Sequence, residues 1–295
     1  YLIEGGALTD PVLSAATTTF VSASPTLDPP QAIQMMLRKR IGCLPVLDAD
    51  GTLTDIITLR NALLGKTSES WAVVMAGGRG TRLGDLTRGI PKPMLPVGGT
   101  PILEHIVEHL VSHGIRRIFI SVNYFAEMIE DHFGDGSRFF CRIEYLREKQ
   151  SLGTGGALSL LPERPTHPLI VMNGDLLTRI NINRLLKFHE EGGYAGTMAV
   201  REHEVVVPFG VAEIDEGRVT ALEEKPSLNY QINAGIYVVG PELVGRIPTD
   251  TFYPITELWN ICLEEALGLG AYAMHESWND IGLPEQYEAA QDETV

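Results

Sequence analysis

The chain has 295 residues, of which 44% are hydrophobic and 21% charged, and these proportions indicate an ordinary globular protein of roughly two domains. A formal net charge of −15 excludes a general nucleic-acid-binding protein, which needs a basic face, so we expect no nucleic-acid partner. No apolar run approaches the roughly 20 residues that span a bilayer, and no signal-peptide pattern opens the chain, so we expect no membrane association and a cytoplasmic location.

Residues 1–66 predict a small α+β unit. Its expected elements are, in order, a strand at Thr18–Val21, a helix after Asp28, strands at Pro45–Leu47 and Leu53–Ile57, and a final helix. The turn Asp50-Gly51 between the last two strands is a strong hairpin signal. A polar stretch at residues 65–70 then marks the boundary to a second unit, which we place at residues 71–295.

The order of these elements resembles a CBS repeat over about residues 16–65, with residues 1–14 as the closing helix and linker of a preceding repeat. Such repeats usually work in pairs, so we expect a homo-oligomer that forms through this segment. In the CBS family, Thr or Ser followed three residues later by Asp holds the ribose of an adenine nucleotide. The matching residues here are Thr58 and Asn61. Because Asn lacks the charge, a packing or dimerisation module is favoured over a nucleotide-binding one.

From residue 71 onward, strands and helices alternate. Core strands are expected at Trp71–Met75, Arg117–Val122 and Leu169–Met172, helices at 102–111, 126–133, 255–267 and 284–292, and β-rich segments around 195–239. This alternation predicts a doubly wound, largely parallel sheet of the α/β class, with functional sites at the carboxyl ends of its strands.

A glycine-rich loop directly after the first core strand is the strongest candidate for a binding site. It reads Ala76-Gly77-Gly78-Arg79-Gly80-Thr81-Arg82-Leu83, and Pro91-Lys92-Pro93 follows. Glycines at a strand end let a ligand approach the backbone and leave N–H groups free to face phosphate. The two prolines stiffen the chain around Lys92 and so aim its ammonium. The loop is neither the dinucleotide fingerprint, whose last glycine would fall on Leu83, nor a P-loop, which needs Gly-Lys-Ser/Thr.

The glycine loop and Lys92 together closely resemble the signature of the sugar-phosphate nucleotidyltransferases. Further segments match this family in order over about residues 71–292, namely Leu152–Ala157, Asn173-Gly174-Asp175, Glu223–Pro226 with Asn233-Ala234-Gly235, and Trp278–Gly282. Each segment alone has an ordinary interpretation as a flexible loop, a turn or a solvated charge run. Five in the family's order are not expected by accident.

The resemblance implies a role for each matched residue. The nucleotide is bound by Ala76, Gly77, Gly78, Arg79, Gly80, Thr81, Gln150, Gly153 and Thr154. Arg82 stabilises the departing pyrophosphate, and Lys92 holds phosphate charge. The sugar phosphate is bound by Gly156, Glu224, Lys225 and Asn233. Asp175 and Asp280 bind Mg²⁺, with Mn²⁺ as an alternative.

A competing pattern lies on the helix expected at 102–111. His105-Ile106-Val107-Glu108-His109 fits the His-x-x-Glu-His arrangement of zinc peptidases. That arrangement needs a third ligand and an open water position. The apolar stripe of the helix already explains the spacing, so we interpret the pattern as a coincidence on a solvated face. The three cysteines, Cys43, Cys141 and Cys262, form neither a zinc pattern nor a disulfide framework, which fits a reducing compartment.

The resemblance implies an enzyme that joins a nucleoside triphosphate to a sugar 1-phosphate, giving a nucleotide-sugar and pyrophosphate. A CBS segment ahead of such a domain resembles bacterial guanylyltransferases of surface-glycan and flagellar-sugar pathways, so GTP is favoured, with UTP, dTTP and CTP open. Guanine would need an acceptor, and Glu148, Gln150 or carbonyls near Gly153 are candidates. The alternatives are a non-catalytic nucleotide-sugar sensor and a nucleotidyltransferase with a non-sugar acceptor.

Overall fold

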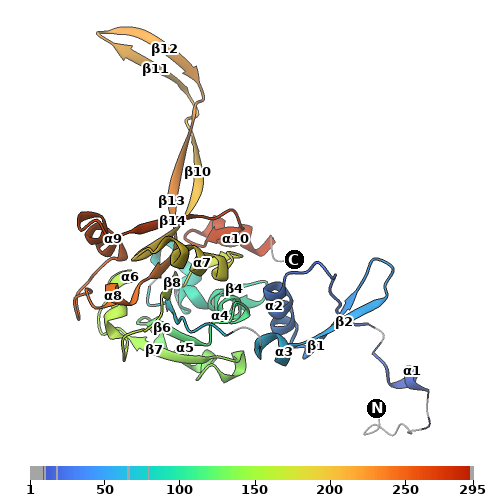
Figure 1. Cartoon of the computed structure of the whole chain (residues 1–295). Helices are drawn as coiled ribbons and strands as arrows, with labels where there is room; N and C mark the ends of the chain where they lie inside the picture. Colours follow the sequence, from blue (N-terminus) through green and yellow to red (C-terminus); the bar gives the residue numbers. More distant parts are fainter. Residues whose placement is uncertain (1–8, 10, 18, 65–66, 79, 293–295) are drawn as a thin grey trace. The chain divides into compact units, whose positions relative to one another are not determined.

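The computed structural model describes residues 9, 11–17, 19–64, 67–78 and 80–292. The chain divides into two compact units, Tyr1–Lys66 and Thr67–Val295, which are considered separately (Figure 1). Thr18 of the first expected strand, Gly65 and Lys66 of the expected boundary, and Arg79 of the glycine loop lie outside the described residues.

The smaller unit is built around one hairpin and two helices. Its elements are α1 (Val12–Ala15), α2 (Pro29–Lys39), β1 (Cys43–Leu47), β2 (Leu53–Thr58) and α3 (Leu59–Leu64). The expected turn is confirmed, because the Asp48 carboxylate accepts from the N–H groups of Asp50, at 3.0 Å, and Thr52, at 2.8 Å. The buried residues of α2 and β1 form a small core of Ala32, Ile33, Met36, Leu44 and Val46.

The strand expected at Thr18–Val21 is not formed by its described residues, 19–21. A single bridge takes its place two residues later, where the Ala23 N–H donates to Pro45 O and the Leu47 N–H to Ala23 O, both at 2.9 Å. The ladder cannot continue, since Ser24 O accepts from the Leu27 N–H in a turn and the intervening Pro25 has no N–H to donate.

The larger unit contains one seven-stranded sheet in the order β14-β10-β13-β8-β3-β6-β7. These strands are β3 (Ala72–Met75), β6 (Arg117–Val122), β7 (Arg142–Arg147), β8 (Leu169–Asn173), β10 (Gly196–Val206), β13 (Ser227–Val239) and β14 (Leu269–Ala273). The four strands from β8 to β7 are parallel, and β13 alone runs against both of its neighbours. The prediction of a doubly wound, largely parallel sheet is therefore confirmed.

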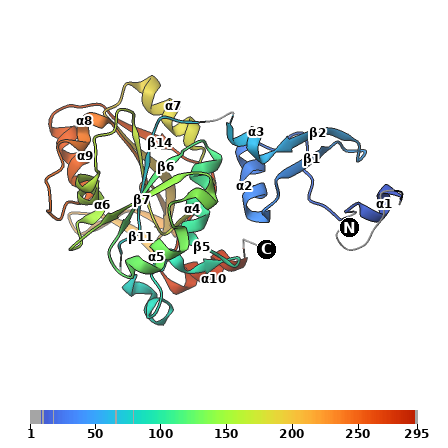
Figure 2. The same cartoon turned by 90° about the horizontal axis from the view of Figure 1, so that it is seen from below.

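Helices cover both faces of this sheet (Figure 2). They are α4 (Ile102–Ser112), α5 (Ala126–Phe133) and α7 (Ile182–Gly192) on one side, and α8 (Pro241–Val244) and α9 (Ile255–Glu264) on the other. Val73, Phe119 and Val171 face the second group and pack with Trp259 of α9. The alternate strand residues are also buried, which explains why these strands are apolar at every position.

The larger unit also contains several shorter elements and a final helix. They are η1 (Thr81–Thr87), η2 (Lys92–Met94), β4 (Pro96–Val97), β5 (Thr100–Pro101), η3 (Ser137–Phe139), α6 (Gly153–Gly156), η4 (Ala157–Leu160), β9 (Leu176–Thr178), β15 (Trp278–Asp280) and α10 (Pro284–Asp292). The helix expected at 255–267 ends at Glu264, and the one at 284–292 has its expected bounds.

The zinc-like pattern on α4 lies on a buried face, so our interpretation of it as a solvated face was wrong. His105, Glu108 and His109 are only 4–6% exposed. The His105 ring donates from Nε2 to Val97 O at 2.9 Å, and the His109 ring donates from Nε2 to Ile180 O at 2.8 Å. Both histidines therefore serve to join α4 to neighbouring loops.

The β-rich region forms a ribbon that projects far from the sheet (Figure 1). β10 and β13 stay paired from Gly196–Val239 to Val206–Ser227, and the hairpin of β11 (Gly210–Asp215) and β12 (Arg218–Glu224) continues the projection. Residues 202–231 are called the arm below, and the rest of the larger unit the body.

We predict that a truncated protein starting at Thr67 folds by itself, and that one starting at Ala72 is less stable. Trp71 lies outside β3 but stacks on Arg117, whose Cζ is 4.1 Å from the ring centroid, and packs on Phe119. Its loss should lower the free energy of unfolding by about 2 kcal/mol, from lost apolar burial and the cation–π contact. Urea denaturation of both proteins measures the difference, and equal stabilities would contradict the prediction.

Candidate nucleotide-binding and metal site

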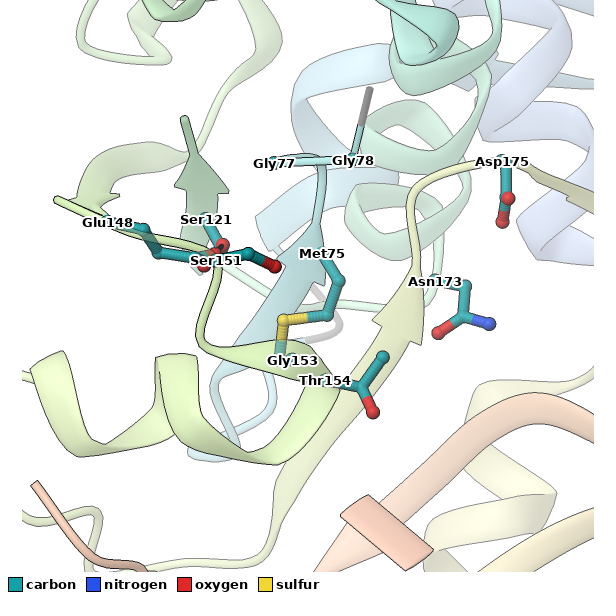
Figure 3. A pocket seen from close by; sticks show the side chains of 10 residues that line it. All are labelled: Met75, Gly77, Gly78, Ser121, Glu148, Ser151, Gly153, Thr154, Asn173 and Asp175. Carbon is teal, nitrogen blue, oxygen red and sulfur yellow. Dashed lines mark hydrogen bonds between the residues drawn. The ribbon is translucent and has the colours of Figure 1, made fainter. Parts of the chain in front are cut away.

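A pocket lies at the carboxyl ends of the parallel strands. Its lining comes from the ends of β3, β6, β7 and β8, from the loop before α6 and from the start of α6. The lining residues are Met75, Gly77, Gly78, Ser121, Glu148, Ser151, Gly153, Thr154, Asn173 and Asp175 (Figure 3). The sheet register explains this convergence, since Met75 pairs with Ser121 on one side and with Asn173 on the other. The site therefore lies where the alternating pattern predicts it.

The glycine loop follows β3 and passes close to side chains of neighbouring segments. A Cβ at Gly77 would lie 3.0 Å from Glu148 Oε1 and 3.3 Å from Asn123 Cβ. Gly80 has φ +63°, and its Cβ would lie 2.8 Å from Lys92 Cβ. Glycine at position 80 thus supplies both a left-handed backbone conformation and room for the Lys92 side chain.

Glu148 occupies the end of the pocket opposite Asp175 (Figure 3). Its carboxylate accepts a hydrogen bond from the Ser121 hydroxyl and another, at 2.8 Å, from the Leu152 N–H. These bonds hold the carboxylate in one orientation. A carboxylate has about four lone-pair positions, so two remain that can accept from a ligand.

The loop that opens α6 is held by a segment before α9. The N–H groups of Gly155 and Gly156 donate to Tyr253 O at 2.9 and 2.8 Å. The Thr154 hydroxyl oxygen accepts from the Ile255 N–H at 3.1 Å, which leaves the hydroxyl hydrogen available to a ligand. A Cβ at Gly156 would lie 2.7 Å from Thr251 O, so this glycine is required for packing.

Asp175 and Asp280 are brought together by a short strand pair. β15 pairs with β9 so that Asp280 lies opposite Leu176, and the Ile281 N–H donates to Asp175 O at 3.1 Å. The Lys92 ammonium hydrogen-bonds Asp175 Oδ2 and lies 4.0 Å from Asp280 Oδ1. Burial and the neighbouring Asp175 raise the pKa of Asp280, and the charges of Lys92 and Arg82 partly offset this increase.

The two carboxylates fit a divalent cation that also binds phosphate. Asp175 Oδ1 and Asp280 Oδ1 are buried and have no hydrogen-bond partner among the described residues, so each has an oxygen free for a ligand. The described residues contain no group of three or more side chains that could hold a metal ion alone. Mg²⁺ commonly takes one or two carboxylates and completes its shell with water and substrate phosphates.

Arg82 lies near Asp280 and is not among the residues that line the pocket. Arg82 is exposed on η1, and its Nη1 lies 3.8 Å from where a Cβ of Gly282 would stand. Thr81 begins η1 and is also exposed. Arg82 is therefore close to Asp280, although the two residues are nearly 200 positions apart in the sequence.

Several expected ligand-binding residues do not line this pocket. Gln150 donates from Nε2 to Asp250 O at 3.1 Å. Asn233 donates to the Tyr237 hydroxyl at 2.8 Å and accepts from the Gly235 N–H. Glu224 is the last residue of β12 and Lys225 follows it, both on the arm and eight or more residues before Asn233 of β13, and the structure does not bring them to the pocket.

Sequence reasoning gave no role to three residues of the site. Ser121 is a single polar residue in an apolar strand, and that break in the pattern was a usable signal. Asn173 lies at the end of β8 with its Oδ1 buried and unpartnered among the described residues. Tyr253 acts through its backbone, so no sequence signal could have identified it.

Family comparison agrees with this geometry. Residues 71–295 match the nucleotidyl transferase family model, and residues 12–64 match the CBS domain model. The chain belongs to the nucleotidyl transferase family. The resemblance predicted from the glycine loop and the later segments is thus confirmed.

Named relatives of this nucleotidyl transferase use different nucleotides. It is 35% identical over 224 residues to the mannose-1-phosphate guanylyltransferase catalytic subunit beta of Danio rerio (73% of this chain, 62% of the relative). It is 33% identical over 239 residues to the UTP–glucose-1-phosphate uridylyltransferase of Synechocystis (74% and 62%). The chain thus spans under two thirds of either relative. Among solved structures, HddC of Yersinia pseudotuberculosis is 26% identical with a TM-score of 0.61, over 77% of this chain and 100% of HddC.

None of the helices in the described part of the chain is both long enough and apolar enough to cross a bilayer.

We predict that Gly80→Ala destabilises the protein by about 1–3 kcal/mol, because alanine at φ +63° is strained and its Cβ would clash with Lys92. The matched control is Gly78→Ala, because nothing lies within 4 Å of its Cβ position and the change should be nearly neutral. Thermal unfolding of the two variants provides the measurement. A Gly80→Ala protein as stable as the control would show that Lys92 does not constrain the loop.

Proposed function

We propose that this protein transfers a nucleotidyl group from a nucleoside triphosphate to a sugar 1-phosphate and releases pyrophosphate. The main support for the proposal is that Lys92 contacts both the glycine loop and the acidic pair Asp175 and Asp280. The stem of Lys92 packs at Gly80, while its ammonium contacts Asp175. A phosphate-facing loop, a buried cation and two convergent carboxylates at one strand edge suit the joining of two phosphorylated substrates.

The residues act mainly by positioning and by reducing charge repulsion. The nucleoside lies in the pocket between Glu148 and Thr154, with its phosphates along the backbone of Gly77 and Gly78. The sugar 1-phosphate oxygen attacks the α-phosphorus in line, and the bond to the β-phosphate oxygen breaks to release pyrophosphate. Arg82, close to Asp280, stabilises the charge that develops on the leaving group. No nucleophilic side chain is needed.

Asp175 and Asp280 are the residues that would hold Mg²⁺ or Mn²⁺. When bound, the cation supplies neutralisation of phosphate charge at this edge of the pocket. Lys92 is already placed to share that task, since its ammonium lies at both carboxylates. The alternative, a nucleotide-sugar sensor without activity, would not need this cluster.

The preferred nucleotide in this proposal is GTP. Guanine presents N1–H and N2–H donors together, and the Glu148 carboxylate lines the pocket with two acceptor positions left. Uracil and thymine present a single ring N–H donor on the corresponding edge. Guanylyl transfer is also the activity in the name of the Danio rerio relative. We assign the product to surface-glycan or flagellar-sugar synthesis in the cytoplasm, on the resemblance alone.

We predict that Arg82→Ala and Asp280→Ala each lower kcat/KM by roughly 10²–10³, the usual loss when one contact to developing charge is removed. Pyrophosphate release with GTP and a panel of sugar 1-phosphates is the measurement. Arg88→Ala is the matched control, because Arg88 is exposed and pairs only with Asp85 among the described residues. Excess chelator should stop turnover reversibly. A folded variant with a near-normal kcat/KM would show that the changed residue has no role in the reaction. Wild-type protein that binds both substrates without turnover would favour the sensor.

We further predict that GTP has the highest kcat/KM among the common triphosphates, and that Glu148→Gln narrows its advantage over UTP by about tenfold or more. The amide keeps the shape of the carboxylate but loses acceptor capacity, and one good hydrogen bond to a base is worth about 1–3 kcal/mol. Paired assays with GTP and UTP measure the ratio. Faster turnover of wild type with UTP, dTTP or CTP would refute the choice of base and leave the reaction class intact.

A further inference from the structure

Helix α10 is held to the rest of its unit by polar side chains. It packs beside the short hairpin of β4 and β5 (Figure 2). Ala290 is 2% exposed, but residues 284–286, 288 and 289 of the helix are exposed. A helix of nine residues is marginal in water and normally depends on a buried apolar face. Here the side chains of Gln286, Tyr287 and Gln291 make five hydrogen bonds to backbone groups outside the helix.

Two of these side chains hold the chain shortly after Lys92. The Tyr287 hydroxyl and Gln291 Nε2 both donate to Pro96 O at 2.7 Å, which satisfies both lone pairs of that carbonyl. Gln291 Oε1 also accepts from the Gly98 N–H at 3.2 Å. Only three residues, all of them buried, separate Lys92 from Pro96. A shift of the Pro96 carbonyl would therefore be transmitted to Lys92.

The third side chain holds the chain just after Asp280. Gln286 Oε1 accepts from the N–H groups of Gly282 and Leu283, both at 2.8 Å. A Cβ at Gly282 would lie 3.1 Å from this oxygen, and also 3.7 Å from Asp280 Oδ1 and 3.8 Å from Arg82 Nη1. Because this position has no side chain, Gln286 comes close to both Asp280 and Arg82.

The two residues beside which α10 is attached carry opposite charges that do not form a hydrogen bond. Lys92 Nζ hydrogen-bonds Asp175 but lies 4.0 Å from Asp280 Oδ1. A charge pair with so little access to water would gain energy by closing to hydrogen-bond distance, about 2.8 Å. Asp280 Oδ1 nevertheless has no hydrogen-bond partner among the described residues. An element bonded to the chain beside both residues can keep them apart, and α10 is bonded in this way.

We propose that α10 is a brace that sets the distance between Lys92 and Asp280. Its positioning residues are Gln286, Tyr287 and Gln291, which act through the backbone. The pairing of β15 with β9 holds Asp280 from the other side, so its carboxylate is fixed between two supports. The brace thereby keeps Asp280 Oδ1 available to a divalent cation. This last step rests on the proposed function, because that function supplies the need for the cation.

Coupling across the brace is tested by amide hydrogen exchange of the full chain without ligands. The double variant Tyr287→Phe/Gln291→Met removes both donors from Pro96 O and leaves the bonds of Gln286 in place. We expect exchange in residues 279–283 to become about threefold faster or more, because the helix no longer holds that segment as firmly. Ala289→Gln, an exposed change on the same helix, is the matched control and should exchange like wild type.

The reciprocal variant, Gln286→Met, keeps the test decisive if the double variant folds poorly. It removes the acceptor of the Gly282 and Leu283 N–H groups and leaves both donors to Pro96 O. Exchange in residues 94–98 should then become faster, although no hydrogen bond in that segment has been removed. Faster exchange confined to the segment whose own hydrogen bonds were cut, in both variants, would overturn the brace.

The effect on the cation is measured by titrating the full chain with Mn²⁺ and following free Mn²⁺ by electron paramagnetic resonance, without substrates. Residues that hold a metal ligand in place typically contribute about 10–100-fold to metal affinity, so the Kd should rise about tenfold in the brace variants. The Ala289→Gln control should keep the wild-type Kd, and Asp280→Asn should abolish binding.

Thermal unfolding of the same proteins shows whether a change in Kd merely follows a loss of stability. An unchanged Kd in folded brace variants, or a wild type without Mn²⁺ binding that depends on Asp280, would contradict the role of the brace at the cation. Wild type that binds Mn²⁺ there but transfers no nucleotidyl group would contradict the proposed function alone, since exchange and Mn²⁺ binding are measured without turnover.

Discussion

The buried ammonium of Lys92 constrains everything around the pocket. Its side chain is only 9% exposed, and an unpaired charge at such a position would cost several kcal/mol. The fold meets this requirement by bringing Asp175 from the end of β8 and Asp280 from β15, which pairs with β9. Glycine at position 80 leaves room for the stem of the lysine. Apolar residues in place of this cluster would be at least as stabilising, so its presence points to function.

The parallel part of the sheet and the position of the pocket were predictable from the sequence. Strands buried on both faces read as continuous apolar runs, and the helix between the first two shows helical spacing, so their parallel order follows. Parallel strands end at one edge, so the glycine loop after β3 and Asp175 after β8 had to lie together. Met75 pairs with Ser121 and Asn173, so these two polar residues lie beside it in the pocket. Ser121 could be recognised in the sequence because it interrupts an apolar strand.

The remaining features depend on contacts that local sequence does not encode. Three-residue strands such as β9 and β15 have no periodicity, so the contact of Asp280 with Asp175 came only from family resemblance. The polar residues of α4 had the spacing of a solvated face, but carbonyls of Val97 and Ile180, from distant segments, satisfy His105 and His109 inside the fold. The region around 195–239 was expected to be β-rich, but that expectation did not include the projecting ribbon that β10 and β13 form.

The net charge of −15 is compatible with two polyanionic substrates because charge acts over a limited range. At physiological ionic strength, exposed charges farther away than about 8 Å are largely screened. Acids on the arm and on the outer helices therefore contribute little at the pocket, where Lys92 is buried and Arg82 is close to Asp280. Within the pocket the two aspartates alone would repel phosphate, so phosphate binding there requires that cations offset them. Lys92 supplies one positive charge, and a divalent cation on the free carboxylate oxygens would supply two more. At these two carboxylates the balance of charge then becomes positive, without any change in the overall composition.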